Sequence, residues 1–468
     1  MTRVLLISQD VMGKAMAGPG IRYFNLAQVL APHVQLTLAI PDSSSQDAMA
    51  GQHAFEVVRY TSQHWPSLAR AASQAQVIIF PSDLASEMPQ LADQPACLVI
   101  DGYDPLLAEW LFVQSHEPLD VQQAQWHERM RLLTRQYLVG DFYLCASERQ
   151  RDWWLGLLEA HGRISPLTFR QDPTLRSLID VVPFGLPSAA PVHTRPVIKG
   201  VWDGIGRDDT VVLWGGGLWP WLDPLTAIRA IALVRQQHPN IRLIFPGTRH
   251  PNPVLAGLVT YTQAAKDLAT ELHLLNQHVF FGDWLPYEDW PNVLLESDVA
   301  LSLHTDTLEA RLAFRSRILE YIWAGLPTVA TQGDATSDMI ARMDLGVVVG
   351  YQDVQAVAAA ILHLLDEPRT HRQAQFAQTQ HTLTWEKAAQ PLIAFCQNPQ
   401  RAADRVDRIN GEVAGNPFYE ARNQQAQTRF AAELQAAQQE TRRWQVLAQR
   451  YEQGRFMKLM RWIKTGQT

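Results

Sequence analysis

The chain has 468 residues, of which 47% are hydrophobic and 19% charged, which is enough for two large domains and an appendage. Its formal net charge of −7 argues against general nucleic-acid binding, and its three widely spaced cysteines exclude a disulfide framework or a Cys-x-x-Cys metal site. No apolar stretch approaches the roughly 18 residues of a membrane span, so a cytoplasmic protein is expected.

Short apolar runs alternate with helical patterns through the first part of the chain. The runs are VLLIS (4–8), VQLTLAI (34–40), QVIIF (76–80), ACLVID (96–101), DFYLCAS (141–147) and IDVVPFG (179–185). This alternation predicts a parallel sheet with crossover helices, that is, a Rossmann-like α/β domain over residues 1–190. A stretch punctuated by Pro183, Pro187, Pro191 and Pro196 follows, and we place the interdomain linker there.

The same pattern then starts again. The runs are TVVLWGGG (210–217), IRLIFPG (241–247), HVFFGD (278–283), DVALSLH (298–304), PTVAT (327–331) and GVVVG (346–350). They predict a second Rossmann-like, doubly wound domain over residues 191–398. Because open α/β sheets bind ligands beyond the carboxyl ends of their strands, two facing sheets would enclose a binding cleft.

Residues 399–468 have a different composition, rich in Gln, Ala and Arg. From Thr441 to the end the chain has seven Lys and Arg residues and one Glu, which gives this segment a net charge of about +6. The remaining residues therefore carry a net charge of about −13. The spacing of Leu434, Ala437, Thr441 and Trp444 predicts a long helix, which either packs on the protein body or forms a coiled-coil homodimer. The basic amphipathic stripe in 455–464 either lies on an anionic inner membrane surface, making the protein peripheral, or is a packed or frayed terminus.

One glycine-rich turn follows the first strand of each predicted domain. Gly18 and Gly20 stand in MAGPGIRYFNLAQVL (16–30), and Arg22 lies in the first turn of the expected helix, so all three are candidates for binding the anionic donor. Glycines let backbone amides approach a phosphate at a helix N-terminus, although such a turn is also common as a purely structural feature.

The second turn has three consecutive glycines, Gly215, Gly216 and Gly217, in LWGGGLWPWLDP (213–224). Their lack of side chains suggests a close backbone approach by a ligand. Trp219 and Trp221 either line a binding site for a sugar or a base, or belong to the hydrophobic core. Asp223 before a proline is expected to cap the next helix.

The third motif is AFRSRILEYIWAGLPTVATQGDA (313–335), which places Arg315 and Arg317 in the first turn of a helix. Cations there oppose the helix macrodipole, so an anionic group is expected in front of the helix.

At this point the chain resembles a known family. ILEYIWAGLPTVAT, VPFGLP (182–187) and the Gly-Pro-Gly turn are similar to motifs of the family 4 retaining glycosyltransferases, over roughly residues 1–390. The resemblance implies the GT-B fold, two Rossmann-like domains facing a cleft, here followed by a C-terminal helical extension. It also implies sugar transfer from a nucleotide-diphosphate donor with retention of anomeric configuration.

The resemblance assigns individual residues. The family has two glutamates eight positions apart, and Glu320 matches the second one, which binds the nucleotide ribose. Leu312 stands where the family has the first glutamate, so Glu309, the nearest carboxylate, is the candidate for that role. The family's Arg and Lys for the donor phosphates are missing after residue 214. Arg315 and Arg317 are expected to replace them, with Arg249 as a further candidate. The alternative is that one of these arginines only pairs with Glu309 or Asp306.

In the first domain Asp101 ends a strand and is expected to face the cleft near the transferred sugar. The expected enzyme is a hexosyltransferase that needs no metal or other cofactor and acts on a glycan or lipid-linked acceptor. The alternatives are a sugar-nucleotide 2-epimerase or glycogen-type phosphorylase of the same fold, or a catalytically silent subunit that acts through its helical tail.

Overall fold

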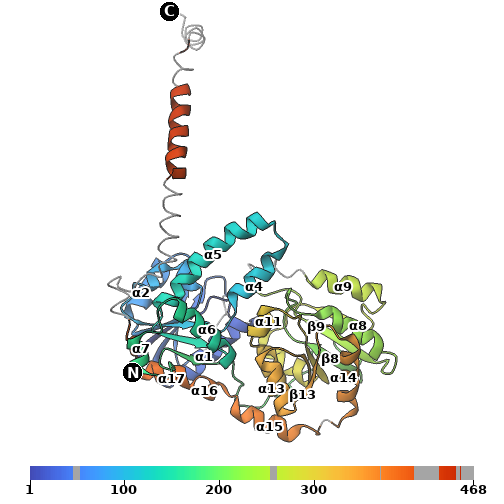
Figure 1. Cartoon of the computed structure of the whole chain (residues 1–468). Coiled ribbons are helices and arrows are strands. Elements are labelled where there is room, and N and C mark those ends of the chain that lie inside the picture. The colour runs from blue at the N-terminus through green and yellow to red at the C-terminus, as the bar shows by residue number, and fades with distance from the viewer. Residues whose placement is uncertain (46–52, 253–260, 369, 405–431, 449–453, 455–468) are drawn as a thin grey trace, which may run out of the picture. The chain divides into compact units, whose positions relative to one another are not determined.

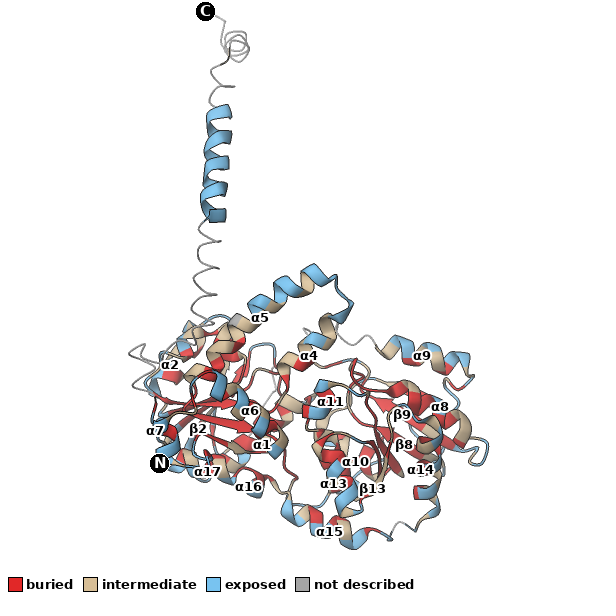
Figure 2. Cartoon of the chain, viewed as in Figure 1, coloured by how far each residue is buried: buried red, intermediate tan, exposed pale blue. Residues whose placement is uncertain are grey.

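The computed structural model describes residues 1–45, 53–252, 261–368, 370–404, 432–448 and 454. Met1–Glu159 and Arg163–Arg405 form one compact unit that contains two α/β domains (Figure 1). Of the later residues, 432–448 form a helix that is exposed along its whole length (Figure 2).

The first domain is built on a seven-stranded parallel sheet. Its strand order is β3-β2-β1-β4-β5-β6-β7. The strands are β1 (Arg3–Ile7), β2 (Gln35–Pro41), β3 (Glu56–Tyr60), β4 (Val77–Pro81), β5 (Cys97–Asp101), β6 (Phe142–Cys145) and β7 (Ile179–Val181). In the centre, Val4 of β1 lies opposite Leu36 of β2 on one side and Val77 of β4 on the other.

Helices cover both faces of this sheet. They are α1 (Gly18–Leu30), α2 (Pro66–Gln74), α3 (Leu84–Glu87), α4 (Leu106–Val113), α5 (Leu119–Val139), α6 (Glu148–Ala160) and α7 (Pro166–Gln171), with 3₁₀ turns at Pro89–Leu91 and Gln114–His116. Alternate residues of β1 enter different cores: Leu6 packs in the cluster that contains Leu26 of α1, and Leu5 packs in the cluster that contains Leu68 of α2. Burial on both faces explains why the strands read as continuous apolar runs.

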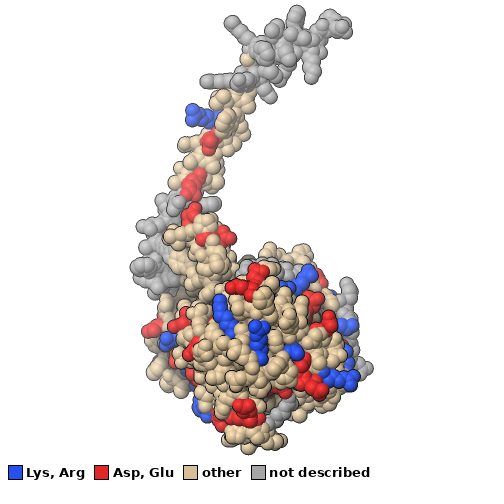
Figure 3. Space-filling view, turned by 90° about the vertical axis from the view of Figure 1, so that its right-hand side faces the viewer, with Lys and Arg blue, Asp and Glu red and all other residues tan. Residues whose placement is uncertain are grey.

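The second domain repeats this topology with six parallel strands in the order β10-β9-β8-β11-β12-β13. The strands are β8 (Thr210–Trp214), β9 (Ile241–Pro246), β10 (Val279–Gly282), β11 (Val299–Ser302), β12 (Thr328–Thr331) and β13 (Gly346–Val349). The helices are α8 (Pro224–Val234), α9 (Tyr261–Glu271), α10 (Trp290–Leu295), α11 (Leu308–Leu312), α12 (Ser316–Trp323), α13 (Ala335–Met343), α14 (Val354–Asp366) and α15 (Gln373–Thr382), with a 3₁₀ turn at Tyr287–Asp289. On the face seen in Figure 3, acidic and basic side chains are interspersed.

The chain passes between the two domains twice. Residues 182–209 make the first crossing without helix or strand, except for a bridge between Leu186 and Thr384. After α15 the chain returns, and α16 (Trp385–Ala388) and α17 (Gln390–Gln397) pack on the first domain, where the rings of Phe395 and Phe142 stack at 4.7 Å. The range 191–398 that the sequence assigns to the second domain therefore includes two helices that pack on the first.

The predicted fold class is confirmed: two doubly wound parallel sheets are present, with helical residues after them. Every strand except β3 coincides with an apolar run named above. The expected cap is also present, because the Asp223 carboxylate accepts a hydrogen bond of 3.0 Å from the backbone N–H of Thr226 at the start of α8.

The predictions for the tail are tested only in part. Residues 432–448 are helical, as predicted, and include Leu434 and Trp444. The basic amphipathic stripe of 455–464 lies outside the described residues, and membrane contact and homodimerisation stay predictions. Within the described part of the chain, no helix has the length and apolar character needed to span a membrane.

Candidate functional site

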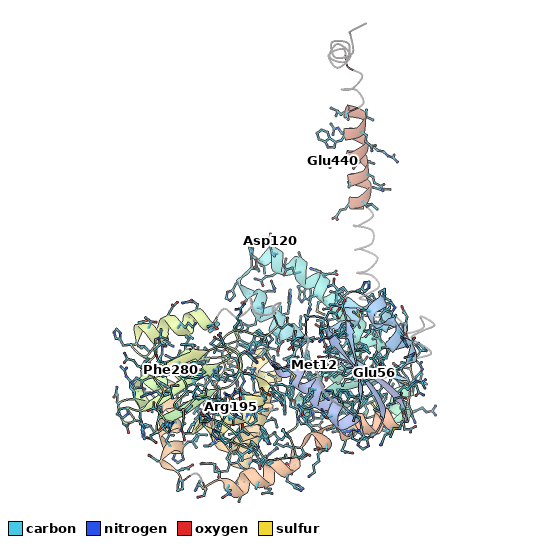
Figure 4. The ribbon with its side chains drawn as sticks, turned by 180° about the vertical axis from the view of Figure 1, so that it is seen from behind. Met12, Glu56, Asp120, Arg195, Phe280 and Glu440 are labelled. Atoms are coloured by element: carbon cyan, nitrogen blue, oxygen red, sulfur yellow. The ribbon has the colours of Figure 1, made fainter. Side chains whose placement is uncertain are left out.

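A cavity of about 1300 Å³ lies between the two domains and is lined by residues of both. Its walls are the segments that follow the carboxyl ends of the central strands: Asp10 after β1, Asp104 after β5, Gly216 after β8 and Trp284 after β10. Met12, in the segment after β1, lies closer to the second domain than Glu56 of the edge strand β3 does (Figure 4). The cavity therefore lies beyond the carboxyl ends of the strands, which is where doubly wound sheets bind ligands.

Hydrogen bonds join the two domains beside this cavity. The Asn252 side-chain amide donates to the Asp10 carboxylate at 2.8 Å, and the Trp284 indole N–H donates to the carbonyl of Met16 at 3.2 Å. The backbone N–H of Tyr287 donates to the carbonyl of Lys14 at 2.7 Å. The segment after β1 is therefore held against the second domain in this structure.

The two arginines of the third motif have different environments. Arg315 is buried and makes a bidentate ion pair with Glu309, with Nη1–Oε1 and Nη2–Oε2 distances of 2.9 and 2.8 Å. Burial alone would lower the pKa of Arg315, but the Glu309 carboxylate raises it. Neither residue lines the cavity. We therefore interpret this pair as structural, which is the alternative that the sequence left open.

Arg317 lines the cavity, and nothing in the described part of the chain forms a hydrogen bond or ion pair with it. Its Cζ lies 6.0 Å from the centre of the Trp214 ring, and burial lowers the pKa of the guanidinium below its usual value. A buried cation without a partner is costly, because the lost hydration is not replaced. An anionic ligand at this position would supply the missing partner.

The start of α12 adds backbone donors to this position. Arg315 is the N-cap residue and gives no side-chain cap, and Phe314, Ser316 and Arg317 all line the cavity. Gly18, at the start of α1, also lines it, and a Cβ atom added there would lie 3.7 Å from Oγ of Ser316. Two helix N-termini thus meet at the cavity, which favours a phosphate group.

The three glycines after β8 approach three different side chains. A Cβ atom added to Gly215 would lie 2.6 Å from the Tyr321 hydroxyl oxygen, whereas one on Gly216 would lie 3.6 Å from Nη2 of Arg317. One on Gly217 would lie 3.4 Å from Nε1 of Trp219. Gly216, with a φ of 80°, and Gly217 line the cavity, and Gly215 is held by a hydrogen bond from its N–H to Tyr321. A side chain at Gly215 would displace Tyr321.

Glu320 lines the cavity one helical turn after Arg317. The indole N–H of Trp290 donates a 2.8 Å hydrogen bond to its Oε2. Burial raises the pKa of Glu320 to about 7, although Trp290 and Arg317 act in the opposite direction. One carboxylate oxygen remains available beside the cation, as the predicted ribose contact requires.

The predicted residues of the first domain form a buried ion pair. Arg22 donates to both Asp101 oxygens, at 2.7 and 2.8 Å, and to the carbonyl of Val182 at 2.9 Å. Asp101 lines the cavity but Arg22 does not. Gly20 allows α1 to approach the preceding segment, since an added Cβ would lie 2.7 Å from the carbonyl oxygen of Val11. We interpret Arg22 and Gly20 as structural supports.

The remaining candidate, Arg249, is exposed and does not line the cavity. Sequence reasoning missed its neighbour His250 and also Asp10, both of which do. Asp10 follows the first strand of its sheet directly, so the rule on carboxyl strand ends could have found it. The role of Trp290 could not be predicted, because nothing in the sequence links it to Glu320, which lies 30 positions later and accepts its hydrogen bond.

The first-domain wall of the cavity is acidic. Burial raises the pKa of Asp104 to about 7, and it also raises the pKa of Asp83 and Glu109. Among the residues that the structure describes, no three His, Cys, Asp or Glu side chains are arranged to hold a metal ion.

If Glu320 binds the ribose of a nucleotide, as the sequence predicts, nucleotide affinity should depend on pH. Burial raises the pKa of Glu320 to about 7, so the carboxylate that would accept hydrogen bonds from two ribose hydroxyls forms as the pH rises through that value. We expect nucleoside-diphosphate affinity, measured by calorimetry, to increase from below pH 7 to above it. Glu320→Gln is the control, because it removes this titration while the phosphate of the ligand still titrates. Identical pH profiles for the two proteins would contradict the assignment.

Comparisons with solved structures place this architecture in a known fold. The Anabaena protein Alr3699/HepE, solved with UDP and glucose, has a TM-score of 0.62 and 16% identity, with coverage of 85% of this chain and 100% of that one. Sucrose-phosphate synthase from Thermosynechococcus elongatus has a TM-score of 0.59 and 16% identity, covering 84% and 97%. WaaG, a glycosyltransferase involved in lipopolysaccharide biosynthesis, has a TM-score of 0.55 and 15% identity, covering 85% and 100%. The fold is therefore GT-B.

The family comparison is more specific for the second domain. Residues 204–380 match the family model of glycosyl transferases group 1. This part of the chain is therefore similar to the group 1 glycosyltransferases, in agreement with the resemblance that the motif ILEYIWAGLPTVAT carries. A comparison with curated protein sequences gives no match.

Proposed function

We propose that the chain is a retaining, family 4-like hexosyltransferase that moves a sugar from a nucleotide-diphosphate donor to a glycan or lipid-linked acceptor without a metal. The observation that carries this proposal is Arg317, whose cavity-lining guanidinium has no hydrogen bond or ion pair within the described chain and lies at the start of α12. The group 1 family match and the UDP complex of a structure with the same fold support it.

The proposed reaction breaks the bond between the anomeric carbon and the β-phosphate oxygen. The electron pair leaves with the nucleoside diphosphate while the acceptor hydroxyl oxygen bonds to the anomeric carbon from the same face and gives its proton to the departing phosphate. Arg317 and the N-termini of α1 and α12 would stabilise the charge that develops on this phosphate. Because these donors are fixed by the fold, they need little reorganisation during the reaction.

Glu320 holds the ribose in this proposal. Its carboxylate is positioned by Trp290, and two vicinal hydroxyls would donate to it. The distance along α12 from Arg317 to Glu320 is about one turn, so one helix would contact both the ribose and the diphosphate.

The deciding experiment incubates the protein with a panel of UDP-, GDP-, ADP- and dTDP-sugars without an acceptor. Slow release of free sugar together with nucleoside diphosphate is expected from a transferase, because water replaces the missing acceptor. A rearranged donor without hydrolysis would instead identify a 2-epimerase. Neither reaction, even with added glycan acceptors, would favour a silent subunit and contradict the proposal.

A further inference from the structure

Four aromatic rings form a continuous surface on the second-domain side of the cavity. Trp219 and Trp221 follow β8 and stack with their ring centres 5.4 Å apart and their planes 3° apart. His250, after β9, lies 5.5 Å from Trp219, and Trp284, after β10, lies 5.4 Å from His250. All four residues line the cavity. We call this set the aromatic wall.

Asp10 from the first domain stands beside the aromatic wall. It is 5% exposed, and its Oδ1 accepts hydrogen bonds from the Asn252 amide and the Val11 backbone N–H. Its Oδ2 is buried and has no hydrogen-bond partner among the described residues. A buried carboxylate oxygen without a donor is destabilising, so a ligand that brings a hydroxyl to this oxygen would gain the missing hydrogen bond.

His250 offers the complementary group. Its Nδ1 accepts a 3.1 Å hydrogen bond from the backbone N–H of Asn252, so in the neutral ring the proton is on Nε2. Burial lowers the pKa of His250, which favours this neutral form. Asp10 Oδ2 is therefore an acceptor and His250 Nε2 a donor in one wall of the cavity. Hydroxyl groups both donate and accept, and so can satisfy both.

The glycine turn fixes where this wall lies along the expected ligand. A Cβ atom added to Gly216 would lie 3.6 Å from Arg317, and one added to the next residue, Gly217, would lie 3.4 Å from Trp219. One added to Gly215 would lie nearest to Tyr321, at 2.6 Å, and 3.3 Å from Trp290. Trp290 holds the ribose-binding Glu320, and Arg317 faces the diphosphate in the function proposed above. The aromatic wall thus begins next to the diphosphate position.

We propose that Asp10 and the aromatic wall form a subsite for a pyranose ring, a proposal that rests on the function proposed above. A pyranose has an apolar face of C–H groups, which packs on aromatic rings, and neighbouring hydroxyls at its rim, which pair with a carboxylate. The ring is either the sugar of the donor or a sugar unit of the acceptor, since both present the same chemistry next to the diphosphate.

The test compares the parent protein with Trp219→Ala and Asp10→Asn. Trp219 is only partly buried, and Asn at position 10 keeps the shape of the side chain while it replaces the unpartnered oxygen by an amide. Trp153→Ala is the matched control, because Trp153 is also partly buried but lies outside the cavity lining. Calorimetry measures the dissociation constants of a nucleoside diphosphate and of the same nucleotide with its sugar. It also measures binding of methyl glycosides of glucose, galactose and mannose in the presence of the nucleoside diphosphate.

If the subsite holds the donor sugar, both variants bind the nucleoside diphosphate like the parent but bind the nucleotide sugar about 10-fold more weakly, or ~1.4 kcal/mol. If it holds an acceptor sugar, both nucleotide affinities stay unchanged and glycoside binding is lost. Parent-like binding of both ligand types by both variants would overturn the subsite. Failure of the parent to bind any nucleotide would instead overturn the proposed function and with it this inference.

Discussion

Replacing Arg317 by alanine should lower kcat/KM for donor hydrolysis by about 10²- to 10³-fold, the usual effect of removing one fixed donor from a developing oxyanion. In the described residues this guanidinium lines the cavity without a protein partner, so its charge is available to the ligand. Arg317→Lys should recover part of the activity, because lysine keeps the charge but loses the planar fork that pairs with two phosphate oxygens.

The control for this prediction is Arg311→Ala, which removes an exposed arginine side chain six positions earlier. Thermal unfolding of each variant shows whether the fold is kept. We expect the control to have parent-like activity. A folded Arg317→Ala protein with parent-like turnover would remove Arg317 from the proposed reaction and leave the proposed diphosphate site without an identified cation.

Replacing Arg315 by alanine should destabilise the protein by about 3–5 kcal/mol, because it leaves Glu309 as an unpaired buried charge. The two side chains are 6% and 2% exposed and share two hydrogen bonds. The double variant Glu309→Met/Arg315→Met should recover most of this loss, since it removes both charges and keeps a similar volume. Chemical denaturation of the three proteins measures the effect through the shift in midpoint.

This experiment also separates the two roles that the sequence allowed for Arg315. If the pair is structural, Arg315→Ala loses stability, and the double variant regains both stability and turnover. If Arg315 is catalytic, the double variant folds but remains inactive. Unchanged stability of Arg315→Ala would contradict the structural interpretation directly.

The sequence predicted most of the sheet architecture for a physical reason. Parallel strands buried on both faces, such as β5 with five buried residues, appear as uninterrupted apolar runs. The edge strand β3 was missed because its residues Glu56–Arg59 are largely exposed or half-buried and include two charges, so it lacks this signal. Local chemistry also predicted the Asp223 cap, because a cap needs only neighbouring residues.

The site was predictable in part. The motif spacing correctly brought Arg317, Glu320 and Gly216 to one cavity, because these positions follow directly from strand ends and helix starts. The sequence does not show whether Arg315 or Arg317 forms an ion pair within the protein. That depends on how the short helix α11 places Glu309 against Arg315. Similarly, the pairing of Arg22 with Asp101 joins residues 79 positions apart and needs the folded sheet. Their catalytic and binding roles stay predictions.

The double passage of the chain between the domains has a mechanical consequence. The two crossings run side by side, joined by hydrogen bonds from Leu186 N–H to Leu383 O at 2.7 Å and from Trp385 N–H to Leu186 O at 3.0 Å, and Gly185 packs against the Trp385 backbone. Two adjacent, hydrogen-bonded crossings favour rotation of one domain about this place over sliding of the domains past each other. In the proposed transferase, substrate entry and product release would then depend on the same hinge.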